Sequence, residues 1–288
     1  MSGIQNLFIS NSSSSSSSPL YIDHGTSAPE WNSTATAYSS SQTNINYHYG
    51  MGTDTFHRYL IVWSRGYSSG GPPYYCSWIP ITENGLDLNG IVRLRFVNSS
   101  FTPGNSFGGF ADTIRGYALH QLYNQVTIQR YNLPTNLKNR SETAPDNFAN
   151  SGEYDNNYLS SHAGLSIGFN RNDGGYHNYA DDSYYICGRS SQEIKKYTPD
   201  GNYISNYTPS GLHRSQGYGI CKDPSSNYWI MAHRNTQFSI INPDLTTGSV
   251  YSNIQTPWNT EDAVIGWTGD LYLKQATGGG SIYRYARQ

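Results

Sequence analysis

The feature that most constrains the fold is a repeat of about 44 residues in the second half of the chain. Short apolar runs begin at Tyr184, Tyr228 and Leu271, and a second run follows each of them, beginning at Ile194, Phe238 and Ile282. The second runs stand 44 positions apart. Runs of this length that are rich in Tyr, Ile and Trp are typical of β-strands. The sequence therefore predicts a series of similar β units.

Turn residues repeat with the same step. Thr198–Gly201 places Pro at the second position of a turn, and Asn242–Asp244 repeats the Pro-Asp pair 44 positions later. A further strand precedes two of the units, at Gly217–Ile220 and Ala263–Gly266. A four-stranded unit of this length has the size of a propeller blade. Stacking such sheets around an axis buries both faces of each one, so we expect an all-β fold of the β-propeller class.

The closest match to a known repeat runs from Ile194 to Asp244. There the chain reads I-K-K-Y-T-P-D-G-N-Y-I, then G-Y-G-I-C-K-D-P-S-S-N-Y-W-I-M-A, then F-S-I-I-N-P-D. This pattern resembles NHL-like repeats of six-bladed β-propellers, with the best match over residues 165–286. The resemblance implies blade geometry and no particular activity, because propellers carry unrelated functions.

The first half contains weaker strand pairs of the same kind. They are Gly116–Leu119 with Val126–Tyr131, Tyr59–Trp63 with Tyr74–Ile79, and Leu7–Ile9 with Leu20–Ile22. Counting each pair as one unit predicts six blades of about 48 residues each. Five blades is the alternative, in which an N-terminal strand at Gln5–Ser10 closes the ring as the outer strand of the last blade. We expect one domain over residues 1–288, with a long loop insertion around 137–162.

Composition excludes several other classes of protein. Charged residues make up 13% of the chain and aromatic residues 14%, which is unlike a helical bundle or a disordered chain. A pI of about 6.4 and a net charge of −2 do not favour nucleic-acid binding. No apolar run is long enough for a membrane helix, and the N-terminus does not resemble a secretory signal. Cys76, Cys187 and Cys221 fit neither a disulfide framework nor a zinc site.

The candidate ligand-binding patch lies in loops that we expect on one face of the propeller. Two sets of loops reach that face, namely those that enter the innermost strand and those that join the second strand to the third. The residues that we expect to approach one another near the axis are Arg189, His213, Arg214, His233, Arg234, Trp258 and Glu261. Arg and His donate to hydroxyl and carboxylate groups, and Trp offers a flat apolar surface, so a small ligand or a glycan is the expected occupant.

No catalytic, metal or cofactor signature accompanies this patch. The eight histidines lack metal-ligand spacing, and the Gly-x-Ser-x-Gly nucleophile pattern is absent. We therefore predict a protein that is not an enzyme and that has no metal or cofactor.

The overall composition resembles virion structural proteins of tailed bacteriophages, such as tail, tail-fibre or capsid-surface proteins. Twenty-six tyrosines, many Ser, Asn and Gly residues, and few lysines contribute to this likeness. It implies a structural or adhesion protein of the virion, made in the host cytoplasm and present in several copies. Its expected partners are other virion proteins and a host-surface glycan. The alternatives are a lectin-like carbohydrate-binding propeller and a metal-dependent lactonase-type hydrolase.

Overall fold

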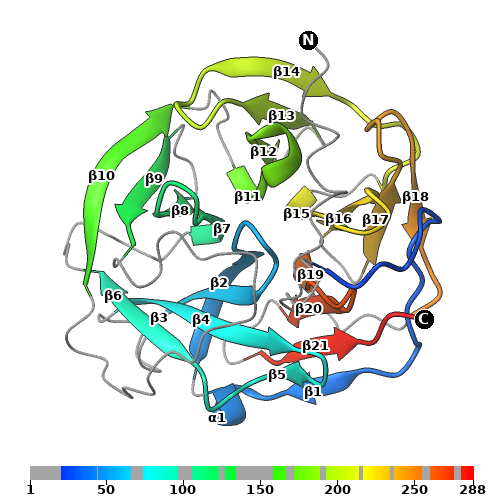
Figure 1. Cartoon of the computed structure of the whole chain (residues 1–288), viewed down its shortest axis with the longest axis horizontal. Helices are drawn as coiled ribbons and strands as arrows, with labels where there is room; N and C mark the ends of the chain where they lie inside the picture. Colours follow the sequence, from blue (N-terminus) through cyan, green and yellow to red (C-terminus); the bar gives the residue numbers. More distant parts are fainter. Residues whose placement is uncertain are drawn as a thin grey trace, which may run out of the picture.

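A computed structural model describes most of the strands of the chain. The described residues are 21–43, 45–65, 74–96, 106–122, 127–133, 158–166, 172–188, 193–213, 217–233, 237–254, 260–275 and 280–288. They form five blades around one axis, seen end-on in Figure 1. Among them, no helix has the length and apolarity needed to cross a membrane.

The blades follow one another along the chain, and their strands run from the axis outward. Blade 1 contains β2 (Asn46–Thr53), β3 (Tyr59–Arg65), β4 (Tyr74–Thr82) and β6 (Val92–Phe96), with β5 (Gly85–Leu86) paired to the end of β4. Blade 2 contains β7 (Ser106–Asp112), β8 (Tyr117–Leu122), β9 (Thr127–Asn132) and β10 (Tyr158–Ser166). Blade 3 contains β11 (Asn172–Asn178), β12 (Ser183–Gly188), β13 (Ile194–Tyr197) and β14 (Tyr203–Tyr207).

The last two blades complete the ring. Blade 4 contains β15 (Gly217–Lys222), β16 (Trp229–His233), β17 (Gln237–Ile241) and β18 (Gly248–Tyr251). Blade 5 contains β19 (Thr260–Ile265), β20 (Leu271–Gln275), β21 (Ile282–Tyr285) and, outermost, β1 (Thr36–Tyr38). A short helix α1 (Ser40–Thr43) follows β1, and a 3₁₀ turn η3 (Tyr179–Asp181) lies between β11 and β12.

The 44-residue repeat corresponds to matching places in successive blades. Ile194, Phe238 and Ile282 each lie on the third strand of a blade, opposite Cys187, Ala232 and Lys274 of the second strand. Three positions further on, the buried residues Tyr197, Ile241 and Tyr285 lie opposite Tyr184, Trp229 and Leu271. The predicted β-propeller is therefore confirmed.

The described residues form five blades, which is the alternative count, so the division of the chain into six equal units is wrong. Of the pair that would supply the sixth unit, Tyr21 and Ile22 lie outside any strand, whereas Leu7–Ile9 and Leu20 lie outside the described residues. An N-terminal strand does close the ring. It is Thr36–Tyr38, which pairs antiparallel with β21, and Gln5–Ser10 lies outside the described residues.

The predicted insertion around 137–162 ends inside a strand. Residues 158–162 belong to β10, and the rest of the insertion lies outside the described residues. At its start β10 pairs in parallel with β6, through Tyr158 and Leu159, while its remaining residues pair with β9. The outer edges of blades 1 and 2 are thereby joined into one sheet (Figure 1).

The innermost strands approach one another closely because they carry glycine. In ring order β2, β7, β11, β15 and β19 each contact the next, and β19 contacts β2. A Cβ atom on Gly52 would stand 1.8 Å from the carbonyl oxygen of Gly109, and one on Gly50 would stand 2.2 Å from the nitrogen of Gly108. Blades 1 and 2 could not meet at this spacing with any larger residue at Gly50 or Gly52.

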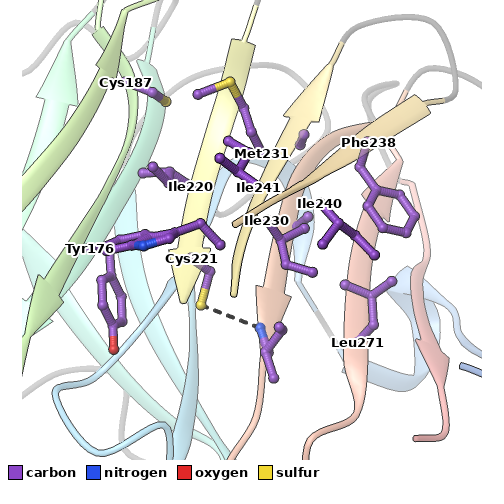
Figure 2. Packing of buried hydrophobic residues seen from close by; sticks show 14 of the residues in the cluster. Tyr176, Cys187, Ile220, Cys221, Ile230, Met231, Phe238, Ile240, Ile241 and Leu271 are labelled. Carbon is purple, nitrogen blue, oxygen red and sulfur yellow. Dashed lines mark hydrogen bonds between the residues drawn. The ribbon is translucent and has the colours of Figure 1, made fainter. Parts of the chain in front are cut away.

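The hydrophobic core lies between the faces of neighbouring blades. Figure 2 shows the part that surrounds blade 4, where Cys187, Ile220 and Met231 pack beside one another. The thiol of Cys221 accepts a hydrogen bond from the backbone nitrogen of Ile265 in blade 5, at 3.5 Å. Burial raises the pKa of this thiol to about 12. All three cysteines are buried, and none of them forms a disulfide.

Candidate functional site

The two faces of the ring are distinguished by the connections that they carry. The turns between the first and second strands of each blade form one face, here called the turn face. The connections from the second to the third strand, and those that enter the next blade, form the opposite loop face. His233, a member of the predicted ligand patch, lies at the loop face, because β16 runs away from the turn face and ends at this residue.

Two members of the predicted patch meet on the loop face. The rings of His213, between β14 and β15, and His233 have centroids 6.0 Å apart, with their planes at 48°. His233 is fully buried, and its Nε2 shares a hydrogen bond of 2.8 Å with the hydroxyl of Ser239 on β17. His213 is partly exposed. The pair thus joins a fixed, buried imidazole to one that solvent can reach.

The other members of the patch stay predictions. Arg189, Arg214, Arg234 and Trp258 lie outside the described residues. Glu261 is placed by its backbone in β19, and its side chain is outside the described part of the molecule. Arg214 and Arg234 directly follow His213 and His233 in the sequence.

The turn face carries a buried polar network that was not predicted from the sequence. Its centre is the turn between β2 and β3, residues Asp54–Arg58, here called the axial hairpin. The carboxylate of Asp54 shapes the hairpin by accepting hydrogen bonds from the backbone nitrogens of Phe56 and Tyr59, at 3.2 and 2.7 Å. His57 takes a left-handed backbone conformation, with φ of 59°. The guanidinium of Arg58 lies over the ring of Trp267 in blade 5, at 4.0 Å.

His57 ties the axial hairpin to blades 3 and 5. Its Nδ1 lies 2.6 Å from the carbonyl oxygen of Ile265, and its Nε2 lies 2.8 Å from the hydroxyl of Tyr176. A carbonyl only accepts, so Nδ1 carries the proton, Nε2 accepts, and the tyrosine donates. Desolvation by burial lowers the pKa of His57 to about 4, against the weaker opposing effect of the hydrogen bond to Ile265. The imidazole is therefore neutral at pH 7.

Thr55 ties the same hairpin to blades 2 and 3. Its hydroxyl accepts a hydrogen bond from the backbone nitrogen of Thr113 at 3.0 Å, and lies 2.9 Å from Nδ1 of His177. The other ring nitrogen of His177 lies 3.2 Å from a carboxylate oxygen of Asp182. Because that carboxylate only accepts, Nε2 of His177 carries the proton and Nδ1 accepts from Thr55. Burial lowers the pKa of His177, and the nearby carboxylate of Asp112 opposes this shift.

The order hydroxyl, imidazole, carboxylate is that of a catalytic triad, but its placement is reversed. In a nucleophilic enzyme the hydroxyl faces the substrate and the carboxylate lies behind the imidazole. Here the hydroxyl belongs to Thr55, which is 3% exposed, while the side chain of Asp182 is 54% exposed. The Thr55 oxygen also lies 3.3 Å from the carbonyl oxygen of Ala111. This burial favours a structural role for the three groups.

Arg115 connects the turns of blades 2 and 3 at the edge of this network. It donates to Asp112 at 2.9 Å and to Asp182 at 2.8 Å. The hydroxyl of Tyr184 donates to the same carboxylate of Asp112, at 2.7 Å. Arg115 is the main cause of the lowered pKa of Asp182, and this ion pair in turn raises the pKa of the arginine. These contacts hold adjacent blades together at their inner ends.

A buried ion pair marks the seam between the last blade and the first. Asp262 on β19 accepts a hydrogen bond from the backbone nitrogen of Met51 on β2, at 2.9 Å. Nζ of Lys274 lies 3.9 Å from the same carboxylate oxygen, and both side chains are buried. Lys274 occupies the place that Cys187 and Ala232 hold in blades 3 and 4.

Metal ligands do not gather in the described part of the chain. Among those residues, no three or more His, Cys, Asp or Glu side chains are placed to hold a metal ion.

A repeated sequence signal could have revealed the turn-face network. Asp54-Thr55 directly follows β2. Asp112 is the last residue of β7 and precedes Thr113, and Asp223 directly follows β15. All three carboxylates accept a backbone hydrogen bond from a residue two or three positions later. Such Asx turns form where an aspartate begins a tight connection.

Comparisons with known proteins support the fold. No protein-family model matches the chain, and no curated protein matches it. The crystal structure of glutaminyl cyclase from Myxococcus xanthus is similar, with a TM-score of 0.53 and 9% identity over 90% of this chain and 96% of that one. A streptogramin B lyase structure has a TM-score of 0.46 and 11% identity, over 88% of this chain and 98% of that one. The glutaminyl cyclase is a β-propeller, and at 9% identity this likeness shows the fold alone.

Proposed function

We propose that the protein is a non-enzymatic binding protein that holds its partner on the loop face. The observation that supports this most directly is the contrast between the two ends of the axis. On the turn face, the polar groups of the axial hairpin are buried and hydrogen-bonded to three other blades. On the loop face, His213 and His233 meet, and His213 reaches solvent.

We further propose that this binding serves a bacteriophage particle. In this proposal the protein is a structural or adhesion component present in several copies, which contacts other virion proteins and a host-surface glycan. The support is compositional: the chain has 26 tyrosines and a charged fraction of 13%. Tyr covers contact area at a low cost in conformational entropy, which suits a surface that binds proteins or sugars.

The described tryptophans do not favour the lectin-like alternative. A sugar-binding pocket needs an aromatic ring with an exposed face. Trp31, Trp63, Trp78, Trp229 and Trp267 are all buried. Only Trp258, which lies outside the described residues, remains for such a role among the six tryptophans of the chain.

Localisation tests the virion proposal. Antibodies raised against the purified protein should decorate phage particles in electron micrographs of lysates from its source, at several positions on each particle. Label that stays with soluble host protein and leaves the particles bare would contradict the proposal.

Binding and turnover assays test the site and the absence of catalysis. On an array of bacterial surface glycans we expect retention that His213→Ala reduces at least several-fold, because its ring reaches solvent in the patch. Lys195→Ala, on a third strand in blade 3, is the control. Turnover of lactone or ester substrates with added Ca²⁺ or Mn²⁺, if lost in Glu261→Gln, would overturn the non-enzymatic proposal.

A further inference from the structure

The segment of residues 21–31, which precedes the first blade, lies against the turn face of blades 4 and 5. The backbone nitrogen of Ile22 donates to the carbonyl oxygen of Trp267 in blade 5, at 2.9 Å. The backbone nitrogen of His24 donates to the hydroxyl of Ser225 in blade 4, at 2.7 Å. The first turns of these two blades are therefore contacted by a part of the chain that comes before the ring.

The first turns of blades 2 and 3, by contrast, present exposed apolar side chains. Ile114 is 40% exposed and Tyr179 is 39% exposed, and they are here called the turn-face patch. Of the four large apolar residues that are exposed in the described part of the chain, two are in this patch. Arg115, next to Ile114, donates to Asp182 in the turn that contains Tyr179, at 2.8 Å, so the two turns are neighbours. Exposed apolar groups that lie together mark surfaces where other segments bind.

A short path of contacts leads from the first described residues to the turn-face patch. Ile22 packs against the core between blades 5 and 1. Its partner Trp267 donates through its backbone nitrogen to the carbonyl oxygen of His57, at 3.0 Å. Phe56, the neighbour of His57 in the axial hairpin, packs edge-on against the ring of Tyr179, with centroids 5.2 Å apart. The path from Ile22 to the patch thus crosses only the axial hairpin.

The sequence before Tyr21 contains an apolar segment that can reach the patch. Leu7–Ile9 consists of three consecutive large apolar residues, and serine occupies every position from 12 to 18. The place predicted for Gln5–Ser10, as the outer strand of blade 5, is taken by β1. The chain between Leu7–Ile9 and Tyr21 spans up to about 40 Å when extended, which is enough to cross the axial hairpin.

We propose that Leu7–Ile9 docks on the turn-face patch of the same molecule. The contact removes the apolar side chains of the segment and of Ile114 and Tyr179 from water, which is its driving force. A tether this short keeps the segment at a high effective concentration beside its own ring, and this favours the same molecule over a second copy. The chain then covers the turn face from blade 4 round to blade 2. The loop face stays open to a partner.

Photo-cross-linking of the whole chain tests this contact. With p-benzoyl-phenylalanine in place of Phe8, illumination should attach the segment to residues 113–116 or 179–182, as mapped by peptide mass spectrometry. The yield should not depend on protein concentration. Adding Leu7→Ser and Ile9→Ser to the same protein should remove most of this cross-link, because the apolar contact is lost. Cross-links that fall on other parts of the ring, or that join two molecules, would overturn the proposal.

Hydroxyl-radical footprinting measures the exposure of the patch itself. The variant Leu7→Ser, Phe8→Ser, Ile9→Ser should show several-fold faster oxidation of Ile114 and Tyr179 than the wild type, because nothing apolar then docks on them. Tyr203 and Ile204, exposed on the outer strand of blade 3, are the controls and should be oxidised at the same rate in both proteins. Equal oxidation of Ile114 and Tyr179 in the two proteins would contradict the proposal.

Discussion

Single residues of the axial hairpin hold the inner ends of the blades together, and His57 does so as a neutral group. Its folded-state pKa of about 4 lies below the ordinary value of 6.5. As the pH falls below 6.5, the imidazole of His57 becomes protonated in the unfolded chain, whereas in the folded protein it stays neutral until about pH 4. The stability that neutral His57 contributes is therefore complete above pH 6.5 and is lost between pH 6.5 and 4.

The His57→Asn variant tests this linkage. Asn tolerates the left-handed backbone conformation at this position, so the hairpin can keep its shape. Between pH 7 and pH 4.5 we expect wild type to lose about 2 kcal/mol more of its free energy of unfolding than the variant, measured by urea denaturation. His120, whose pKa burial lowers to about 3, titrates in both proteins. Equal losses in the two proteins would contradict this role of His57.

Thr55 gives a second prediction at the same scale. Thr55→Val keeps the shape of the side chain but removes the oxygen that accepts from Thr113 and bonds to His177. Leaving these buried groups without a partner should lower the free energy of unfolding by about 2 kcal/mol. Thr36→Val on β1 is the control, because that side chain is exposed. A loss at Thr55 no larger than at Thr36 would count against the network.

The elements most sensitive to substitution are the innermost strands. Gly52→Ala would place a methyl group 1.8 Å from the carbonyl oxygen of Gly109, where only a backbone shift can relieve the clash. We expect a loss of about 4 kcal/mol or failure to fold. Gly217→Ala meets the flexible end of Met231, at 3.0 Å, and should cost much less. Thermal denaturation measures the loss of stability in each variant. Similar losses of stability in Gly52→Ala and Gly217→Ala would show that blades 1 and 2 are not packed this closely.

The elements also show how much of the fold the sequence could predict. The strand pairs of blades 3 to 5 follow from apolar runs at a constant step, because their buried residues Ile194, Phe238 and Ile282 repeat. The closing strand Thr36–Tyr38 could not be found in this way. It is three residues long, two of them exposed, and its partner lies at the other end of the chain. A strand of that kind is defined by long-range pairing and leaves no periodic pattern.

The candidate site, like the fold, could be predicted from the sequence only in part. Loop positions between strands placed His213 and His233 on one face, and the structure brings their rings together. The turn-face network escaped prediction because its members come from blades 1, 2, 3 and 5, and only the closed ring makes them neighbours. Hydrogen bonds between distant segments leave no mark on local spacing. Only the aspartates at the ends of innermost strands, Asp54, Asp112 and Asp223, carried a local signal.

At the scale of the whole molecule, closure of the ring depends on the two ends of the chain. The segment before β1 anchors this closure through Trp31, which packs against Phe238 and Tyr251 of blade 4 and donates to the carbonyl oxygen of Gly269. Two blades are thereby held by residues that precede the first blade in sequence. A rigid ring of this kind can present its loop face without rearrangement of the strands beneath.

A cross-link between the two ends tests the five-bladed ring most directly. Ala37 on β1 lies opposite Tyr283 on β21, a pair that exists only if the N-terminal strand completes the last blade. Directly opposite residues of antiparallel strands are close enough for a disulfide. The variant Ala37→Cys with Tyr283→Cys should form an intramolecular disulfide on oxidation, detected by intact mass and by faster migration on a non-reducing gel. Ala37→Cys with Tyr203→Cys, on the exposed outer strand of blade 3, should stay reduced. A first variant that stays reduced, or a second that cross-links as readily, would contradict the ring.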